Sequence, residues 1–256
     1  MAWPGIRDRR IPALLLAALG SLAWLALWAS RDAPWGHSLL HAGHTMGMGP
    51  AALAGFFVLG WTLMTIAMML PTSGPLFLLF RRMVSKRPAA AWLVAALLAG
   101  YLGVWVLFGL AVHLAIQGLR AAASGVPWLE RNSWAASAVI LGGAGLYQFS
   151  PLKYACLDKC RSPMMFLTER WRGVRPAREA LRIGAAHGAY CVGCCWSLML
   201  VMFAAGMSNF GGMLALGAAM GAEKNFSWGR RLSPVLGGLL LAGAVATVVL
   251  AKTAQH

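Results

Sequence analysis

Long apolar stretches alternate with short basic loops along this 256-residue chain. Several stretches approach or exceed the roughly 20 apolar residues that an α-helix needs to cross a bilayer. The pattern therefore predicts an all-α, polytopic transmembrane helical bundle with about seven spans. The expected spans are residues 11–29, 51–70 with a continuation to 80, 89–114, 133–149, 183–206, 210–222 and 234–251.

Two of these stretches refine the fold. The stretch 210–222 is short, so it forms either a full hairpin or a re-entrant pair with 183–206, and the re-entrant case leaves about five complete spans. The first stretch, 11–29, is longer than the roughly 7–15 residues of a secretory signal core, and we expect a retained anchor. The chain has no repeat, and we treat residues 1–256 as a single transmembrane domain.

The longest polar stretch, residues 152–182, predicts a loop with helices at the membrane surface. Ser162 followed by Pro163 is typical of a helix start, with serine as the cap and proline in the first turn. We expect residues 164–167 to face the membrane surface. Pro176 is expected to open a further helix that continues into the next apolar stretch.

Lys and Arg are concentrated in alternate loops. If the N-terminus lies inside, 18 of the 22 Lys and Arg residues fall in inside loops and 4 fall in outside loops. Cytoplasmic loops of membrane proteins carry such an excess of positive charge. The split predicts an N-in, C-out orientation in an inner membrane and places residues 152–182 in the cytoplasm.

The composition favours a membrane protein and argues against two other classes. Hydrophobic residues make up 59% of the chain and charged residues only 11%, whereas soluble domains carry roughly 25% charged residues. A net charge of +15 is also typical of proteins that bind nucleic acid. Here the charges lie in short loops between apolar stretches, so we expect no nucleic acid partner.

All five cysteines fall near the predicted cytoplasmic face, where thiols are kept reduced. Cys194 and Cys195 follow Cys191 by three and four positions, so both lie on the same helix face as Cys191. The same face carries His187 one turn earlier and Met199 one turn later. A lone buried cysteine is usually a small apolar side chain. Three cysteines and a histidine on one face instead favour metal ligation or redox chemistry.

A second pair, Cys156 and Cys160, follows the fourth apolar stretch at a spacing of four. We expect this pair to meet the first group at the inner membrane face. Thioether sulfurs, which are also soft donors, occur on a different span from the cysteines: Met64, Met68 and Met69 lie on the second predicted span. Each methionine is equally a common packing residue in an apolar core.

The predicted outer loop 36–50 combines imidazole and thioether groups, namely His37, His41, His44, Met46 and Met48. Such donors suit copper, and we interpret the loop as a candidate metal-capture loop, with a plain polar loop as the alternative. Only seven acidic residues exist, too few and too scattered for a magnesium or calcium site.

Two adjacent charges, Glu223 and Lys224, end the sixth apolar stretch. They have two interpretations. Either the two charges mark the membrane interface, or Glu223 pairs with a cation of the cysteine cluster.

These motifs resemble a family of bacterial predicted metal-binding integral membrane proteins, defined by domain of unknown function 2182 and labelled copper chaperone-like. The shared segments lie between residues 61 and 224 and include residues 64–72, 147–163 and 223–224. The most specific segment, residues 188–199, contains the pattern Cys-x-Gly-Cys-Cys-Trp. Residues 209–212 depart from the family pattern, because they are rich in glycine where a tryptophan is expected. The resemblance implies metal binding in a bacterial plasma membrane.

We therefore predict a multi-pass membrane protein that handles copper(I), with zinc as the competing metal. It would deliver copper, assist assembly of a copper enzyme or pass copper across the membrane, with a copper-dependent enzyme or a soluble metallochaperone as partner. Two alternatives are a membrane thiol–disulfide oxidoreductase and a non-catalytic assembly subunit, and no catalytic residue is assigned. The predicted metal ligands are Met64, Met68, Met69, Cys156, Cys160, His187, Cys191, Cys194, Cys195 and Met199.

Overall fold

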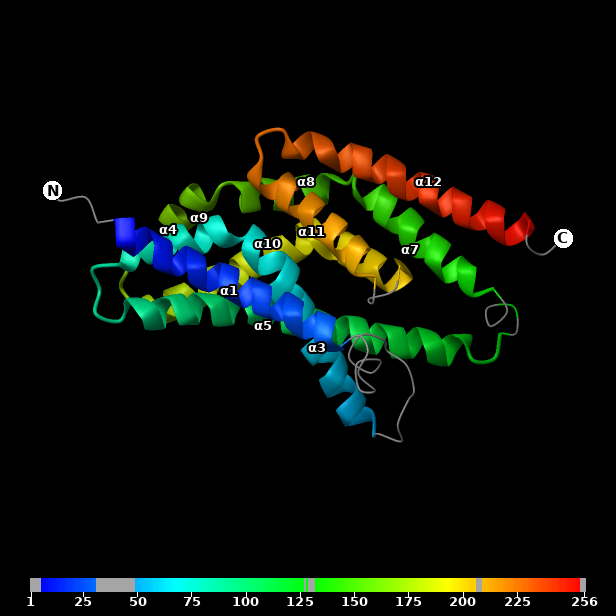
Figure 1. Cartoon of the computed structure of the whole chain (residues 1–256), viewed down its shortest axis with the longest axis horizontal. Helices are drawn as coiled ribbons and strands as arrows, with labels where there is room; N and C mark the ends of the chain where they lie inside the picture. Colours follow the sequence, from blue (N-terminus) through cyan, green and yellow to red (C-terminus); the bar gives the residue numbers. More distant parts are fainter. Residues whose placement is uncertain (1–5, 31–48, 127, 129–131, 206–208, 254–256) are drawn as a thin grey trace.

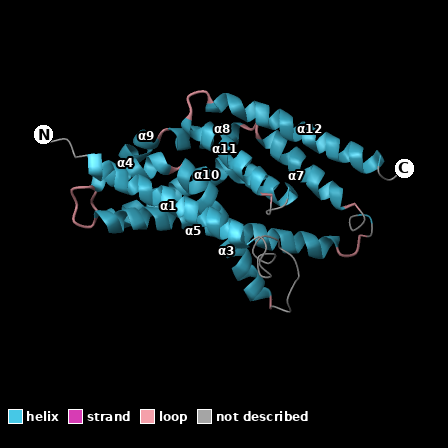
Figure 2. Ribbon diagram, in the orientation of Figure 1, coloured by secondary structure: helices cyan, strands magenta, loops and turns pink. Residues whose placement is uncertain are grey.

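The computed structural model describes residues 6–30, 49–126, 128, 132–205 and 209–253. The regular secondary structure of these residues is helical, and they contain no strand (Figure 2). The all-α prediction is therefore confirmed. The predicted outer loop of His37, His41, His44, Met46 and Met48 lies outside the described residues.

Four helices are long and apolar enough to cross a membrane, counted among the described residues. They are α3 (Pro50–Thr72), α5 (Ala90–Ala123), α10 (Pro176–Ala205) and α12 (Leu232–Thr253). Two shorter apolar segments lie in α1 (Ile6–Ser30) and α7 (Ser133–Tyr147). The remaining helix of this region is α11 (Phe210–Asn225). These helices identify an all-helical protein that associates with a membrane. In Figure 1, α7 and α12 run side by side along one edge of the molecule.

The predicted stretch 51–80 forms two helices rather than one. Pro71 lies in the last turn of α3, which ends at Thr72, and α4 (Gly74–Val84) starts after Ser73. A proline removes one backbone hydrogen bond and so frees a carbonyl in the preceding turn. The Tyr101 hydroxyl of α5 lies at this break. It donates a hydrogen bond to the Met69 carbonyl at 3.4 Å and lies 3.2 Å from the Ser73 hydroxyl.

The polar stretch 152–182 contains the two short helices α8 (Pro151–Arg161) and α9 (Pro163–Arg170). Ser162 occupies the cap position of α9, as predicted, but its side chain makes no capping hydrogen bond. Met164 and Met165 are each 60% exposed, whereas the next two side chains of α9 are buried. Only half of the run 164–167 therefore points outward.

Pro176 opens α10, which continues without a break through the cysteine motif, as predicted. Glycines let this helix approach α5 closely. A Cβ added at Gly184 would overlap the carbonyl oxygen of Leu97, and one at Gly100 would overlap that of Leu181. Small residues at such contacts allow membrane helices to pack backbone against backbone. The face of α10 that carries the cysteines is thereby held in the centre of the bundle.

Candidate metal centre

The predicted stripe on α10 is buried along its length. Each of its side chains is at most 2% exposed: His187, Cys191, Cys194, Cys195 and Met199. Residues three and four apart lie above one another on a helix, so the sequence spacing puts all of them on one side. On that side the cysteines contact Tyr101 of α5, Cys160 of α8 and Lys224 of α11.

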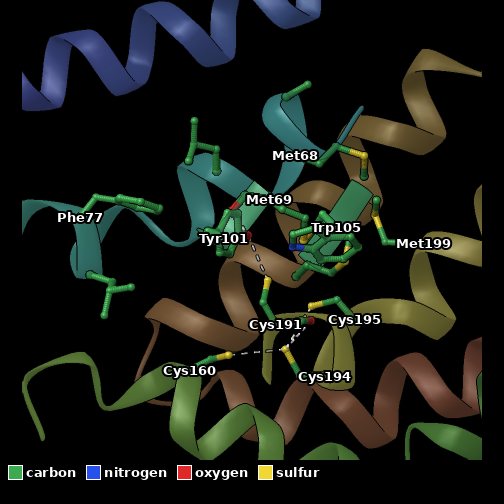
Figure 3. Packing of buried hydrophobic residues seen from close by; sticks show 14 of the residues in the cluster. Met68, Met69, Phe77, Tyr101, Trp105, Cys160, Cys191, Cys194, Cys195 and Met199 are labelled. Atoms are coloured by element: carbon green, nitrogen blue, oxygen red, sulfur yellow. Dashed lines mark hydrogen bonds between the residues drawn. The ribbon is translucent and has the colours of Figure 1, made fainter. Parts of the chain in front are cut away.

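Cys194 is the meeting point of the two cysteine groups. Its sulfur lies 3.3 Å from the Cys195 sulfur and 3.9 Å from the sulfur of Cys160 on α8 (Figure 3). It also donates a hydrogen bond to the Cys191 carbonyl oxygen at 3.3 Å. All five cysteines are free thiols. The structure thus brings together two cysteine groups that are separated in the sequence.

Cys156 is placed by the glycine of the Cys-x-Gly-Cys-Cys motif. A Cβ on Gly193 would lie 2.5 Å from the Cys156 sulfur, so only glycine leaves room for that thiol. Tyr147 fixes the same turn by donating to the Gly193 carbonyl at 2.6 Å. Burial raises the pKa of the Cys156 thiol above its ordinary value, so this residue is protonated at neutral pH.

Buried methionines extend the soft donors beyond the cysteines. They come from three helices and are at most 2% exposed: Met64, Met68 and Met69 of α3, Met199 and Met202 of α10, and Met213 and Met220 of α11. Met69 is linked to the cysteines through Lys224, because its sulfur and the Cys191 sulfur both contact the Lys224 ammonium nitrogen.

Lys224 is a member of the cluster that the sequence reasoning did not include. Its ammonium nitrogen lies 3.0 Å from the Cys191 sulfur, 3.2 Å from the Thr72 hydroxyl and 3.7 Å from the Met69 sulfur. Tyr101 was also missed, and its hydroxyl lies 3.1 Å from the Cys191 sulfur (Figure 3). The position of Lys224 at the end of an apolar stretch could have pointed to this role, because a charged side chain that is buried there needs a partner.

Glu223 points away from the cysteines and pairs with Lys153. The ammonium nitrogen of Lys153 lies 2.8 Å from the carboxylate, and Ser233 donates to the same carboxylate at 2.5 Å. Both members of the pair are at most 1% exposed. Glu223 and Lys224 are therefore both buried in the bundle with partners of their own. The buried pair anchors the end of α11, and Lys224, the next residue, faces Cys191.

His187 is buried beside the cysteines without a complete set of partners. Its Nδ1 atom has no hydrogen bond within the described residues. Its ring lies 5.5 Å from the Phe166 ring and 6.0 Å from the Tyr101 ring, centre to centre. A buried nitrogen with a free lone pair is a donor for a metal ion.

In the described part of the chain, no three His, Cys, Asp or Glu side chains are arranged to hold a metal ion as they stand. The Cys191 sulfur contacts Lys224 and Tyr101 and also interacts with the thiols of Cys194 and Cys195. Cys194 in turn contacts Cys195 and Cys160. Ion binding therefore requires a rearrangement of sulfurs that are already neighbours.

The sequence profile of the copper chaperone family PpoB2 matches residues 58–247. The chain belongs to this copper chaperone family. The match confirms the resemblance seen in the sequence motifs, and it supports copper as the metal. Comparisons with curated proteins and with solved structures gave no match. The matched range contains all five cysteines and Lys224, whereas the outer loop 36–50 precedes it.

Proposed function

We propose that this protein binds copper(I) at the inner membrane face, as an N-in, C-out protein of a bacterial plasma membrane with about seven spans. The thiolates of Cys191, Cys194 and Cys195 are the primary ligands, and Cys160 completes the site. The observation that carries this proposal is the contact of Cys194 with both Cys195, at 3.3 Å, and Cys160, at 3.9 Å.

The donor set favours copper(I) over harder ions. Thiolate and thioether are soft donors that select copper(I), whereas magnesium and calcium require oxygen ligands. The buried carboxylate of Glu223 is held by Lys153 and Ser233, and that of Asp158 is exposed and pairs with Arg230. Zinc takes four ligands in a closed tetrahedron, and thioether sulfur is a poor ligand for it. The neighbouring sulfur of Met69 therefore favours copper(I).

Lys224 supplies a counter-charge. A copper(I) ion bound by two or three thiolates is a complex with net negative charge, and a buried charge without a partner is costly. The Lys224 ammonium lies 3.0 Å from the Cys191 sulfur. We infer that it neutralises the complex, and that copper binding turns the Cys191 sulfur without expelling the lysine from the site.

The buried methionines form a path of ligands along which copper moves away from the cytoplasm. Met64, Met68 and Met199 are secondary ligands that receive copper from the thiolates. Cys156 and His187 border the site and serve its loading. The outer loop, with His37, His41, His44, Met46 and Met48, captures or releases copper on the other side. The role is delivery of copper, to a copper-dependent enzyme or from a soluble metallochaperone.

A second candidate function is thiol–disulfide exchange. The Cys160 and Cys194 sulfurs are 3.9 Å apart and both thiols are free. A small movement would bring them to bonding distance, and exchange with the disulfide of a partner would join them while that disulfide is reduced to two thiols. This alternative requires a stable oxidised form in the membrane.

X-ray absorption of the purified, copper-loaded protein tests the proposal. We expect a copper(I) edge and a first shell of sulfur atoms. A copper(II) edge, or a shell dominated by nitrogen and oxygen, would contradict it. Replacement of Cys160 by serine should reduce the number of sulfur neighbours, whereas replacement of the exposed Ser85 by alanine should leave the spectrum unchanged.

A further inference from the structure

A pocket of about 460 Å³ lies where α9, the following loop and the start of α10 meet. It is lined by Arg170, Arg172, Glu179, Arg182, Ile183 and Ala186. Three of the six side chains carry a guanidinium group, and two are apolar. The metal centre uses none of these residues.

The single carboxylate of the pocket does not neutralise the arginines. Glu179 accepts hydrogen bonds from four backbone N–H groups, of Arg172, Gly173, Val174 and Arg175, at 2.7–3.0 Å. The carboxylate is thus occupied in closing the loop before α10. Arg172 and Arg182 are exposed and form no ion pair with any residue that the structure describes. The pocket therefore presents uncompensated positive charge.

The third arginine is oriented by its neighbours. Arg170 lies 3.2 Å from the exposed carboxylate of Glu169, and its guanidinium lies 4.2 Å from the centre of the Phe166 ring. A surface ion pair of this kind is weak, so Arg170 remains available to an anion. The same Phe166 ring contacts His187, which connects the pocket to the cysteine cluster.

The surroundings place this pocket at the membrane surface. Met164 and Met165 on α9 are each 60% exposed, and apolar side chains that face outward on a short helix are typical of a helix lying in the interface. The apolar floor of the pocket, Ile183 and Ala186, belongs to α10, whose apolar stretch begins here. Guanidinium groups above an apolar floor match the phosphate and the glycerol region of a lipid.

We propose that this pocket binds the phosphate group of an anionic phospholipid of the inner leaflet. Guanidinium groups bind phosphate oxygens in a bidentate manner, which a point charge cannot reproduce. Basic pockets on the cytoplasmic side of membrane helices attract anionic headgroups. The lipid bridges α9 and α10 and so stabilises the segment that packs Phe166 against His187.

Native mass spectrometry of the full chain in detergent tests this proposal, with phosphatidylglycerol and phosphatidylcholine as probes. We expect preferential retention of phosphatidylglycerol. The double variant Arg172→Gln/Arg182→Gln should reduce that retention by roughly tenfold or more. The matched control is Arg175→Gln/Arg178→Gln, which removes the same charge from exposed positions outside the pocket, and it should change retention by less than about twofold.

Further measurements keep the test independent of folding. The variant Arg172→Lys/Arg182→Lys keeps the charge and loses bidentate geometry, and it should give an intermediate loss. Equal losses in the glutamine variant and its control would overturn the proposal, because attraction would then be general. Displacement of the lipid by inorganic phosphate alone at millimolar concentration would also overturn it, since the pocket would then bind free phosphate.

Discussion

The ammonium nitrogen of Lys224 lies 3.0 Å from the sulfur of Cys191, and both side chains are buried. The two residues belong to different helices and are 33 positions apart in the sequence. A lysine buried against a cysteine sulfur stabilises negative charge on that sulfur. In a copper–thiolate complex the same lysine balances the net charge of the ligands.

Replacement of Lys224 by methionine should therefore weaken copper(I) binding. Loss of one partner of a buried charge pair is strongly unfavourable, and we expect an increase in Kd of at least roughly tenfold. Competition with a chromogenic copper(I) chelator measures the change. Lys86→Met is the matched control, because Lys86 is exposed, and its Kd should equal that of the wild type. An unchanged Kd in Lys224→Met would show that the counter-charge role is wrong.

The five cysteines are free in the structure, and they should be thiols in the native membrane, because the proposed orientation places them in a reducing compartment. Mass spectrometry after alkylation of denatured protein, with and without prior reduction, counts them. We expect five alkylated cysteines in both samples. In the folded protein, Cys156 should react slowly at neutral pH and faster at alkaline pH, because burial raises its pKa. A dominant disulfide between Cys160 and Cys194 would instead favour the oxidoreductase function.

Orientation has a separate test, which follows from the 18-to-4 division of Lys and Arg between the two sides. A reporter enzyme that is active only in the periplasm, fused after His256, should be active. The same reporter fused within the 152–182 loop should be inactive. The reverse pattern would place the cysteines on the oxidising side and would remove the reason for expecting free thiols there.

The contact between α5 and α10 should tolerate no larger side chain at Gly184. An added Cβ would overlap the carbonyl oxygen of Leu97, so Gly184→Ala forces the two helices apart. We expect a loss of about 1–3 kcal/mol in the free energy of unfolding, measured by denaturant titration in detergent micelles. Gly103→Ala on α5 is the control, because its Cβ meets nothing within 4 Å. Equal stability of the two variants would contradict this packing.

Periodicity and hydropathy sufficed to predict the helices and the buried stripe. His187, Cys191 and Met199 share a face because a helix repeats every 3.6 residues, and the structure buries all of them. Helix ends were less predictable. The third predicted span was 89–114, yet α5 continues to Ala123, because hydropathy reports the apolar thickness and not the last hydrogen bond of the helix.

Contacts between helices account for most of what the sequence did not reveal. The hydroxyl of Tyr101 reaches the Cys191 sulfur across 90 positions, and Cys160 reaches Cys194 across 34. No periodicity relates such residues, because their proximity depends on how the helices pack. Glu223 and Lys224 illustrate the difficulty: adjacent in sequence, they point to Lys153 and to Cys191 respectively.

Copper and zinc per protein, measured by elemental analysis after purification under reducing, copper-supplied conditions, test the central claim most directly. The wild type should retain copper, and Cys191→Ser/Cys195→Ser should lose it while it still inserts into the membrane. Met213→Leu, a change at a buried methionine outside the proposed primary ligands, should keep most of the copper. A wild type without metal, or a double cysteine variant with as much copper as the wild type, would contradict the assignment of the site.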